Sequence, residues 1–426
     1  MNLVYGIKDK PKFNQLILFA LQQLLAILAA TIAVPSIIGN GMSQSAALFG
    51  AGVGTLVYLF FTKFSSPVFL GSSFAFLGSM STAFAGAATV AGGYAGLLLG
   101  ALFAGLVYVV IALIVKKVGV QWISKLMPAV VIGPTVAIIG LSLAGNAIGD
   151  LTGGANTYVS IICGLVTLAV TMMCSVFGKK MMKMIPFVIG ICAGYIVAAI
   201  FTLCGVPVID FSAFGAMKWV PDFTFVTAFK GFKDVTGSYI GTIFVAYAPV
   251  AFVVFAEHIA DHKNISSIIG KDLLEEPGLH RTLLGDGVGS IAGAFFGGCP
   301  NTTYGESIGC VAISGNASVV TILATAILAI VAAFFAPFTT FLATIPSCVM
   351  GGVCVALYGF IAVSGLKMVQ KVDLNDNHNL FVVSVILIAG IGGMTVSFGK
   401  ITITSVACAL ILGILTNVLL TEKKAK

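Results

Sequence analysis

Apolar segments of about twenty residues, almost free of charged side chains, follow one another along nearly the whole chain. An α-helix needs a segment of this length and character to cross the hydrocarbon core of a bilayer. Of the 426 residues, 59% are hydrophobic and only 9% are charged, whereas soluble domains average about 25% charged residues. A soluble fold of this length could not bury so much apolar surface. The sequence therefore predicts an all-α polytopic membrane protein.

The hydropathy pattern predicts fourteen transmembrane spans, of which the third, ninth and tenth are short or broken. The expected spans are 14–36, 44–62, 70–85, 91–115, 127–147, 156–177, 185–204, 238–259, 282–297, 305–316, 318–337, 346–365, 378–397 and 400–421.

The distribution of basic residues supports this count, because cytoplasmic loops of membrane proteins are enriched in Lys and Arg. With the N-terminus in the cytoplasm, all but four of the 22 basic residues fall on the cytoplasmic side. The exceptions are Lys218, Lys230, Lys233 and Lys400. The pattern predicts a protein of the cell membrane, inner or cytoplasmic in a bacterium, with both termini in the cytoplasm. The net charge of +7 then reflects topology, and no nucleic-acid partner is expected.

Two interrupted segments share one layout. Ser65–Phe76 and Gly297–Gly315 each contain a proline, a few residues that favour extended backbone, a glycine and then small polar residues. They lie in the third and tenth spans, so seven spans separate them and the two halves have opposite orientations. Paired interruptions in inverted halves are the best sequence indication of a transporter's binding site. The polar stretch 205–236 is the expected extracellular linker between the two repeats.

Two carboxyl groups lie in or beside apolar spans, Glu257 at the end of the eighth and Glu306 at the broken tenth. An ionised side chain at the bilayer centre costs about 2.5–3.5 kcal/mol, so an acidic residue retained there indicates a functional site. Two carboxyl groups close together in a membrane cannot both ionise cheaply, so one can bind and release a proton. A protonated carboxyl both donates and accepts, which suits a ligand edge with C=O beside N–H, such as that of uracil. Linked binding of ligand and proton is the basis of symport.

The stretch AEHIADHKN places Asp261 four residues after Glu257, on the same helix face. Asp261 is either a proton-relay neighbour of Glu257 or the polar end of the span. His258 and His262 have the spacing of a zinc-binding pair, but the glutamate precedes the first histidine instead of following it, and no third ligand is evident. We therefore expect the histidines near the membrane interface, with no metal, no cofactor and no catalytic residues. The protein is not expected to be an enzyme.

Four stretches resemble the nucleobase–ascorbate transporter family and, within it, the branch of bacterial uracil permeases. They are LQQLLAILAATIAVP (21–35), FLGSSFAF (69–76), AEHIADHKNISSIIGKDLLEEPGLHRTLLGDGVGS (256–290) and PNTTYGESIGCVAIS (300–314). The resemblance covers almost the full chain.

The resemblance implies two inverted seven-span repeats arranged as a core domain and a gate domain. Spans 3 and 10 would each begin with a short extended strand. The implied parts are core 1–118 (spans 1–4) and 237–340 (spans 8–11), gate 119–204 (spans 5–7) and 341–421 (spans 12–14), and a cytoplasmic tail 422–426. The gate domain would also form a homodimer, with membrane lipid around the assembly.

The resemblance also assigns roles to individual residues. Glu257 matches an eighth-span acidic residue that contacts the base and takes part in proton coupling, and Glu306 matches its tenth-span partner on the base. Asp261 joins these two as a proton-coupling candidate.

The remaining predicted substrate-binding residues flank the two broken spans. Gly305 and Phe74 match positions whose backbone amides face ligand carbonyls, and Tyr304 and Ser73 stand beside them. Tyr358, in the twelfth span, is expected where the gate meets the core.

The resemblance implies a proton-coupled importer of a nucleobase, uracil first, that works by alternating access. By this resemblance the chain departs from uracil permeases at Gln22-Gln23, Asp261, Ser307 and Ser314-Gly315, and Asp261 occurs in purine members. A carrier of xanthine, uric acid or guanine is therefore the alternative within the family. Anion exchangers share the fold, but a fixed carboxylate at Glu306 would repel an anion.

Overall fold

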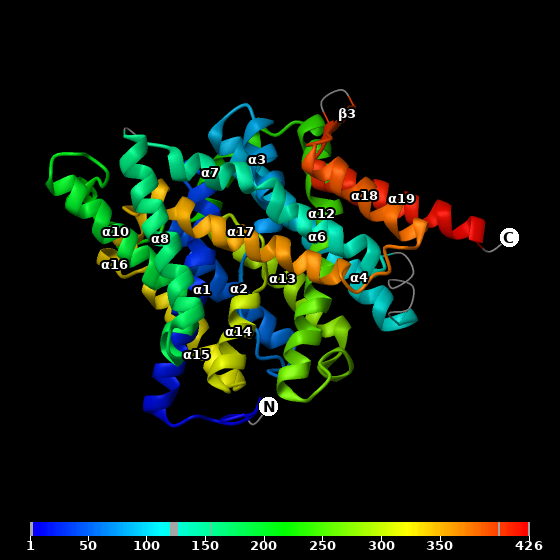
Figure 1. Cartoon of the computed structure of the whole chain (residues 1–426), viewed down its shortest axis with the longest axis horizontal. Helices are drawn as coiled ribbons and strands as arrows, with labels where there is room; N and C mark the ends of the chain where they lie inside the picture. Colours follow the sequence, from blue (N-terminus) through cyan, green and yellow to red (C-terminus); the bar gives the residue numbers. More distant parts are fainter. Residues whose placement is uncertain (1–2, 120–126, 155, 399–400, 425–426) are drawn as a thin grey trace.

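The computed structural model describes residues 3–119, 127–154, 156–398 and 401–424 (Figure 1). The predicted cytoplasmic placement of Lys125 and Lys426, and the predicted outer placement of Lys400, concern residues outside these ranges.

Helices make up most of the fold. Those of eight or more residues are α1 (Phe13–Ile38), α2 (Gln44–Phe61), α3 (Leu77–Ala85), α4 (Val90–Val118), α6 (Ala129–Ser142), α7 (Ala144–Thr152), α8 (Thr157–Phe177), α10 (Pro186–Leu203), α11 (Thr224–Gly231), α12 (Gly237–Ile269), α13 (Leu279–Gly297), α14 (Gly305–Ser314), α15 (Val319–Ala333), α16 (Ala336–Ala343), α17 (Ser347–Val369), α18 (Asn377–Ile391) and α19 (Ser405–Lys424). Shorter elements are η1 (Phe74–Phe76), α9 (Lys180–Met184), η2 (Phe211–Ala216), η3 (Phe232–Asp234), η4 (Leu274–Gly278) and the strands β1 (Leu70–Ser72), β2 (Asn301–Thr303), β3 (Val396–Phe398) and β4 (Ile401–Ile403).

Eight of the described helices are long and apolar enough to cross a membrane. The pair α15 and α16, bent by 82°, would make a ninth span, and three shorter apolar helices are also present. The chain is therefore a multi-pass, mainly helical membrane protein. Each of the fourteen predicted spans contains a described helix or helix pair, although the third begins in strand β1 and the thirteenth ends in strand β3. The number of crossings stays a prediction, because α13 and α14 do not combine the necessary length and hydropathy.

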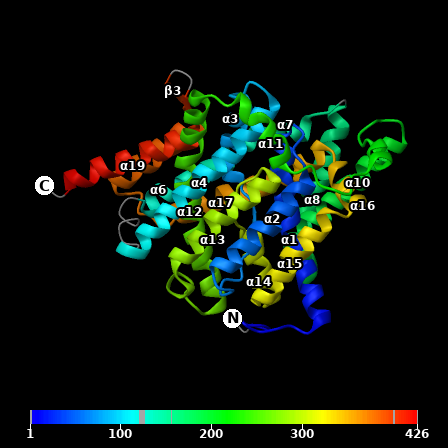
Figure 2. The same cartoon turned by 180° about the vertical axis from the view of Figure 1, so that it is seen from behind.

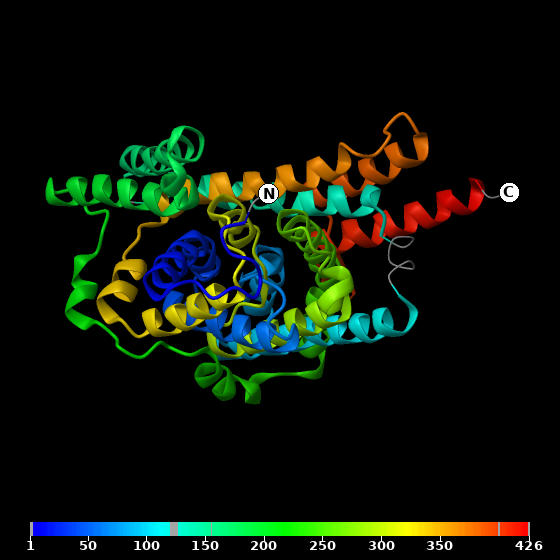
Figure 3. The ribbon, with the colours of Figure 1, turned by 90° about the horizontal axis from the view of Figure 1, so that it is seen from below.

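The helices pack in two groups that lie one above the other in Figure 3. In one group α17 packs against α6, α7 and α8, and α18 packs against α6 and α19. In the other, α13 packs against α2 and α4, and α15 packs against α1 and α2; Figure 2 shows α1, α2, α13 and α15 side by side. The site described below lies between the two groups.

Strands β1 and β2 come from distant parts of the chain and pair with each other. Leu70 lies opposite Thr303 in the antiparallel register, and the amide of Ser73 donates to the carbonyl of Pro300 at 2.9 Å. Both strands are fully buried, which is the condition for extended backbone inside a membrane. Because the pairing is antiparallel, η1–α3 and α14 leave the strand pair from opposite ends.

The strand pair requires a glycine at position 71. A Cβ atom on Gly71 would lie 2.3 Å from the ring of Tyr304, far inside van der Waals contact. The Tyr304 hydroxyl donates to the carbonyl of Ser72 at 2.8 Å, so the ring lies across β1 and is fixed at its tip. The absence of a side chain at Gly71 thus leaves room for the Tyr304 ring, which holds the two strands together.

Glycine also brings α2 and α13 close together. A Cβ atom on Gly50 would lie 2.4 Å from the carbonyl oxygen of Gly293. Small residues of this kind let helix backbones approach where lipid supplies no hydrophobic driving force. The close approach of α13 to α2 also buries polar side chains on the surface of α13.

The N-terminal segment is bound to the loop after α14. The amide of Val4 donates to the carbonyl of Gly315 at 2.7 Å, and the amide of Ala317 donates to the carbonyl of Tyr5 at 2.9 Å. The start of the chain therefore helps to fix the end of the helix that carries Glu306.

Candidate functional site

A cavity of about 340 Å³ lies where the strand pair meets the two helix groups. It is lined by residues of α1, α6, α8, α9, α10, α12, α14 and α17 and of the two broken segments. Seven of the predicted site residues line it: Ser73, Phe74, Glu257, Asp261, Tyr304, Gly305 and Glu306.

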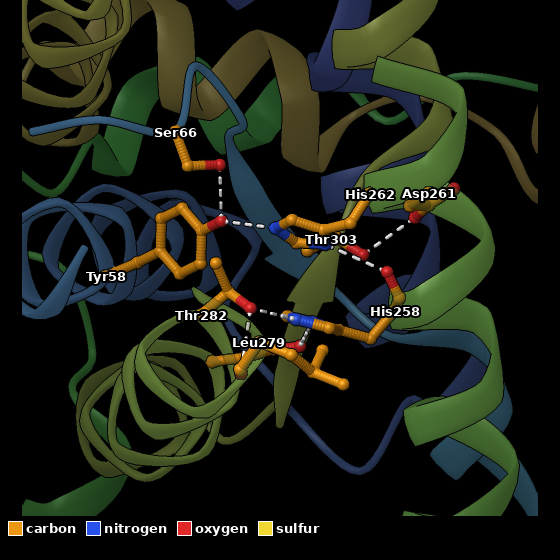
Figure 4. Close-up of polar contacts among 9 residues, drawn as sticks. Tyr58, Ser66, His258, Asp261, His262, Leu279, Thr282 and Thr303 are labelled. Atoms are coloured by element: carbon orange, nitrogen blue, oxygen red, sulfur yellow. Dashed lines mark hydrogen bonds and ion pairs between the residues drawn. The ribbon is translucent and has the colours of Figure 1, made fainter. Parts of the chain in front are cut away.

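Helix α12 supplies two of the three carboxyl groups. Glu257 and Asp261 lie one turn apart on the same face of the helix. The hydroxyl of Thr303, on β2, donates to Oδ2 of Asp261 at 2.7 Å (Figure 4). No hydrogen bond to the Glu257 carboxyl is formed by any described residue. Asp261 is thus fixed to the strand, and Glu257 is available to a ligand.

Glu306 occupies the first turn of α14, directly after Gly305. The first backbone N–H groups of a helix have no partner within the helix and carry partial positive charge, so they stabilise a nearby carboxylate or bind a ligand carbonyl. Glu306 lines the same cavity as Glu257 and Asp261, and carboxylates that share a site repel one another when ionised. The cavity therefore combines three carboxyl groups with the N-terminus of α14.

The apolar side of the cavity includes the ring of Phe74. This ring makes an edge contact with Tyr358 on α17, at a centroid distance of 5.7 Å. Tyr358 is not among the lining residues, whereas its neighbour Leu357 is. The tyrosine therefore supports the Phe74 ring from behind. The Tyr358 hydroxyl is buried and forms no hydrogen bond with any described residue that lines the cavity.

Gln23 and Ser307, two of the positions that depart from uracil permeases, contact each other. The side-chain amide of Gln23 donates to the backbone carbonyl of Ser307 at 3.2 Å and also contacts its hydroxyl. The same hydroxyl accepts from the amide of Phe69 at 3.1 Å. Ser307 thereby connects α1, the approach to β1 and the first turn of α14. These departures fix the frame of the site without lining the cavity.

A second polar cluster lies outside the lining of this cavity, between α12 and α13. His258 and Asp286 are 0% and 1% exposed, and Nδ1 of His258 lies 2.7 Å from Oδ2 of Asp286. Nε2 of the same ring lies 3.0 Å from the Thr282 hydroxyl (Figure 4). The Thr282 hydroxyl also lies 3.0 Å from the carbonyl oxygen of Leu279.

The donor in the contact between Nε2 and the Thr282 hydroxyl depends on the tautomer of the His258 ring. The contact between Nδ1 and Asp286 needs one proton between the two atoms, held either by the ring or by the carboxyl. Without this proton, a lone pair would face a carboxylate at 2.7 Å.

His262, one turn further along α12, continues the cluster. Its Nδ1 donates to the backbone carbonyl of His258 at 2.8 Å. Its Nε2 lies 2.7 Å from the Tyr58 hydroxyl, which lies 2.7 Å from the Ser66 hydroxyl (Figure 4). Both histidines are 0% exposed and contact residues of α2 and α13. Their predicted place near the membrane interface stays a prediction.

Sequence reasoning missed Asp286, although it lies inside a predicted span. The available signal was an acidic residue within the run GDGVGS, between two glycines that allow close helix packing. Among the residues that the structure describes, no group of three or more His, Cys, Asp or Glu side chains could hold a metal ion.

Comparison with known proteins identifies the family. Residues 14–398 match the family described as "Permease family", under the label Xan_ur_permease. The chain belongs to this family. It is 41% identical to the uracil permease of Bacillus caldolyticus over 425 residues, 98% of this chain and 94% of that protein. It is 36% identical to the uracil permease of Escherichia coli K12 over 417 residues, 96% of this chain and 92% of that protein. The chain is accordingly a transporter and not an enzyme.

Solved structures of anion transporters share the fold. The transmembrane domain of the cyanobacterial bicarbonate transporter BicA matches with a TM-score of 0.69 at 17% identity, covering 97% of this chain and 100% of that one. Murine Slc26a9, in its inward-facing state, matches with a TM-score of 0.71 at 11% identity, covering 98% and 69%. At these identities the likeness concerns the fold alone.

Proposed function

We propose that this permease imports a nucleobase, with uracil as the first candidate, by symport with protons through alternating access. One observation carries the proposal: Glu257 on α12 and Glu306 on α14 line the same cavity beside a buried strand pair. The uracil permeases that resemble the chain over nearly its full length support the choice of substrate.

The groups around the cavity match the edges and faces of a nucleobase. A protonated carboxyl at Glu306 would donate to a ring carbonyl and accept from the adjacent N–H, which an ionised carboxylate alone cannot do. The N–H groups at the start of α14 would bind a second carbonyl, and the ring of Phe74 offers an apolar face. A volume of about 340 Å³ is near the lower end of the range of about 300–1,000 Å³ found for small-molecule sites.

Glu257 is the proposed coupling residue. Its carboxyl lines the cavity without a hydrogen-bond partner among the described residues, so a proton and a ligand can reach it together. When ligand and proton stabilise each other's binding, the coupling is reciprocal and a proton gradient can drive uptake. Asp261, held by Thr303 at 2.7 Å, is the proposed neighbour in this exchange.

The remaining features of the proposal concern the whole protein. The core would comprise 1–118 and 237–340, the gate 119–204 and 341–421, and a homodimer would form through the gate in the cytoplasmic membrane.

The cavity with Glu257 also reaches Lys183 and Met368, which are predicted to be cytoplasmic. An inward-open state explains this arrangement.

Asp261, where uracil permeases carry His, favours one alternative, a purine carrier with the same mechanism. Anion exchange is the weaker alternative despite the shared fold, because Glu306 occupies the helix N-terminus that an anion would need.

Direct binding tests the proposed substrate. Titration of the purified protein with uracil, thymine, xanthine and uric acid is expected to give saturable binding of the pyrimidines. Binding of purines alone would assign the purine alternative. Binding of bicarbonate or sulfate, with no binding of any base, would contradict the proposal.

A further inference from the structure

A second cavity, of about 250 Å³, lies on the other side of Phe74. It is formed by α3, by the junction of α6 and α7, and by residues 404–406 at the start of α19. Phe74, Ala75 and Ile139 line both cavities and therefore form the wall between them.

The two cavities open towards opposite faces of the protein. Ser81 of α3, Asn146 near the start of α7 and Thr404 just before α19 line the second cavity. They lie towards the ends of predicted spans that the basic-residue pattern places outside. The first cavity instead reaches Lys183 and Met368, on the predicted cytoplasmic side. The second cavity is thus an outer vestibule, separated from the first cavity by the wall of Phe74, Ala75 and Ile139.

The vestibule has a chemistry of its own. Its polar lining consists of hydroxyl groups and one carboxamide, and it contains no carboxyl group among the described residues. The side chains of Ser81 and Asn146 are exposed and form no hydrogen bond with any other described residue. A carboxamide presents an acceptor beside a donor, the complement of a C=O next to an N–H. The same side-chain type reads base edges in nucleic acids through paired hydrogen bonds.

We propose that this vestibule is an outer recognition subsite for the nucleobase, with Asn146 pairing to the base edge above the wall formed by Phe74 and Ile139. This inference rests on the proposed function. Because the vestibule lacks carboxyl groups, the base binds there without a proton and gains its proton-linked contacts only after passing the wall to Glu257 and Glu306. The outer subsite determines how tightly the base is bound when it arrives from outside, and it leaves the affinity of the inner site unchanged.

The test compares uptake from the two faces. Asn146→Ala is expected to raise the KM for labelled uracil about threefold to tenfold in right-side-out vesicles, as for the loss of a neutral hydrogen bond, with kcat unchanged. In inside-out vesicles its KM should equal that of the wild type. Asn146→Gln, which keeps the carboxamide, should restore part of the loss. Ile148→Ala, exposed on the same helix and absent from the cavity lining, is the matched control.

An unchanged KM from the outer face, or an equal rise from both faces, would overturn the outer subsite. These outcomes differ from a failure of the proposed function, in which the wild-type protein itself would transport no nucleobase from either face.

Discussion

Nδ1 of His258 lies 2.7 Å from Oδ2 of Asp286, and both side chains are buried between α12 and α13. His258 directly follows Glu257 in α12. The helix therefore presents a cavity-facing carboxyl on one side and a buried pair, joined by a proton, on the other. This pair fixes the rotation of α12 and with it the position of Glu257.

Replacing Asp286 tests the role of this pair. Asp286→Leu leaves His258 Nδ1 buried without a partner and should lower the free energy of unfolding by about 1–3 kcal/mol. Asp286→Asn keeps a donor for Nδ1 and should stay much closer to the wild type. Thermal unfolding of the detergent-solubilised variants measures both. Equal melting temperatures for the leucine variant and the wild type would show that the pair has no structural role.

Glu306→Gln should weaken nucleobase binding about tenfold to a hundredfold, because one charge-assisted or paired contact contributes about 1.5–3 kcal/mol. Calorimetric titration of the purified protein measures the change in Kd. Glu275→Gln, an exposed carboxyl in η4 before α13, is the matched control and should bind normally. Wild-type affinity in the Glu306 variant would remove this residue from the site.

Glu257→Gln should abolish accumulation of substrate against a gradient while retaining exchange, since glutamine can hydrogen-bond but cannot release a proton. Counterflow of labelled substrate in proteoliposomes measures exchange, and uptake under an inward proton gradient measures accumulation. If the variant still accumulated substrate with normal pH dependence, Glu257 would not be the coupling residue.

Gly71→Ala should disrupt the strand pair, because its Cβ atom would lie 2.3 Å from the Tyr304 ring. Overpacking of this kind costs about 1–3 kcal/mol, so the variant should melt earlier and transport poorly. Gly359→Ala, in α17, meets no atom within 4 Å and should melt at or above the wild-type temperature. Similar stability of the two variants would mean that Tyr304 moves aside freely.

The sequence was sufficient to predict the membrane class and the family, and both are confirmed. It also located the cavity residues, because an acidic residue in an apolar segment stands out without any knowledge of the fold. Glu257 and Glu306 could be recognised in this way. Their roles in binding and coupling, and the division into core and gate, stay predictions.

The buried cluster between α12 and α13 could not be predicted in the same way. His258 and His262 end an apolar run, which is also what residues at a membrane interface do. Their burial depends on the close approach of α13 to α2 through glycines such as Gly50 and Gly293, a tertiary contact that no local pattern specifies. Asp286 was overlooked although it lies inside a predicted span, because its partner His258 is brought to it only by the packing of α12 against α13.

The most direct test of the account is uptake of labelled uracil into proteoliposomes, with an inward proton gradient and after the gradient is collapsed. Gradient-dependent accumulation in the wild type, lost in Glu257→Gln and blocked by unlabelled thymine but not by purines, is the predicted result. Uptake of uracil that is unaffected by collapsing the proton gradient would contradict proton symport.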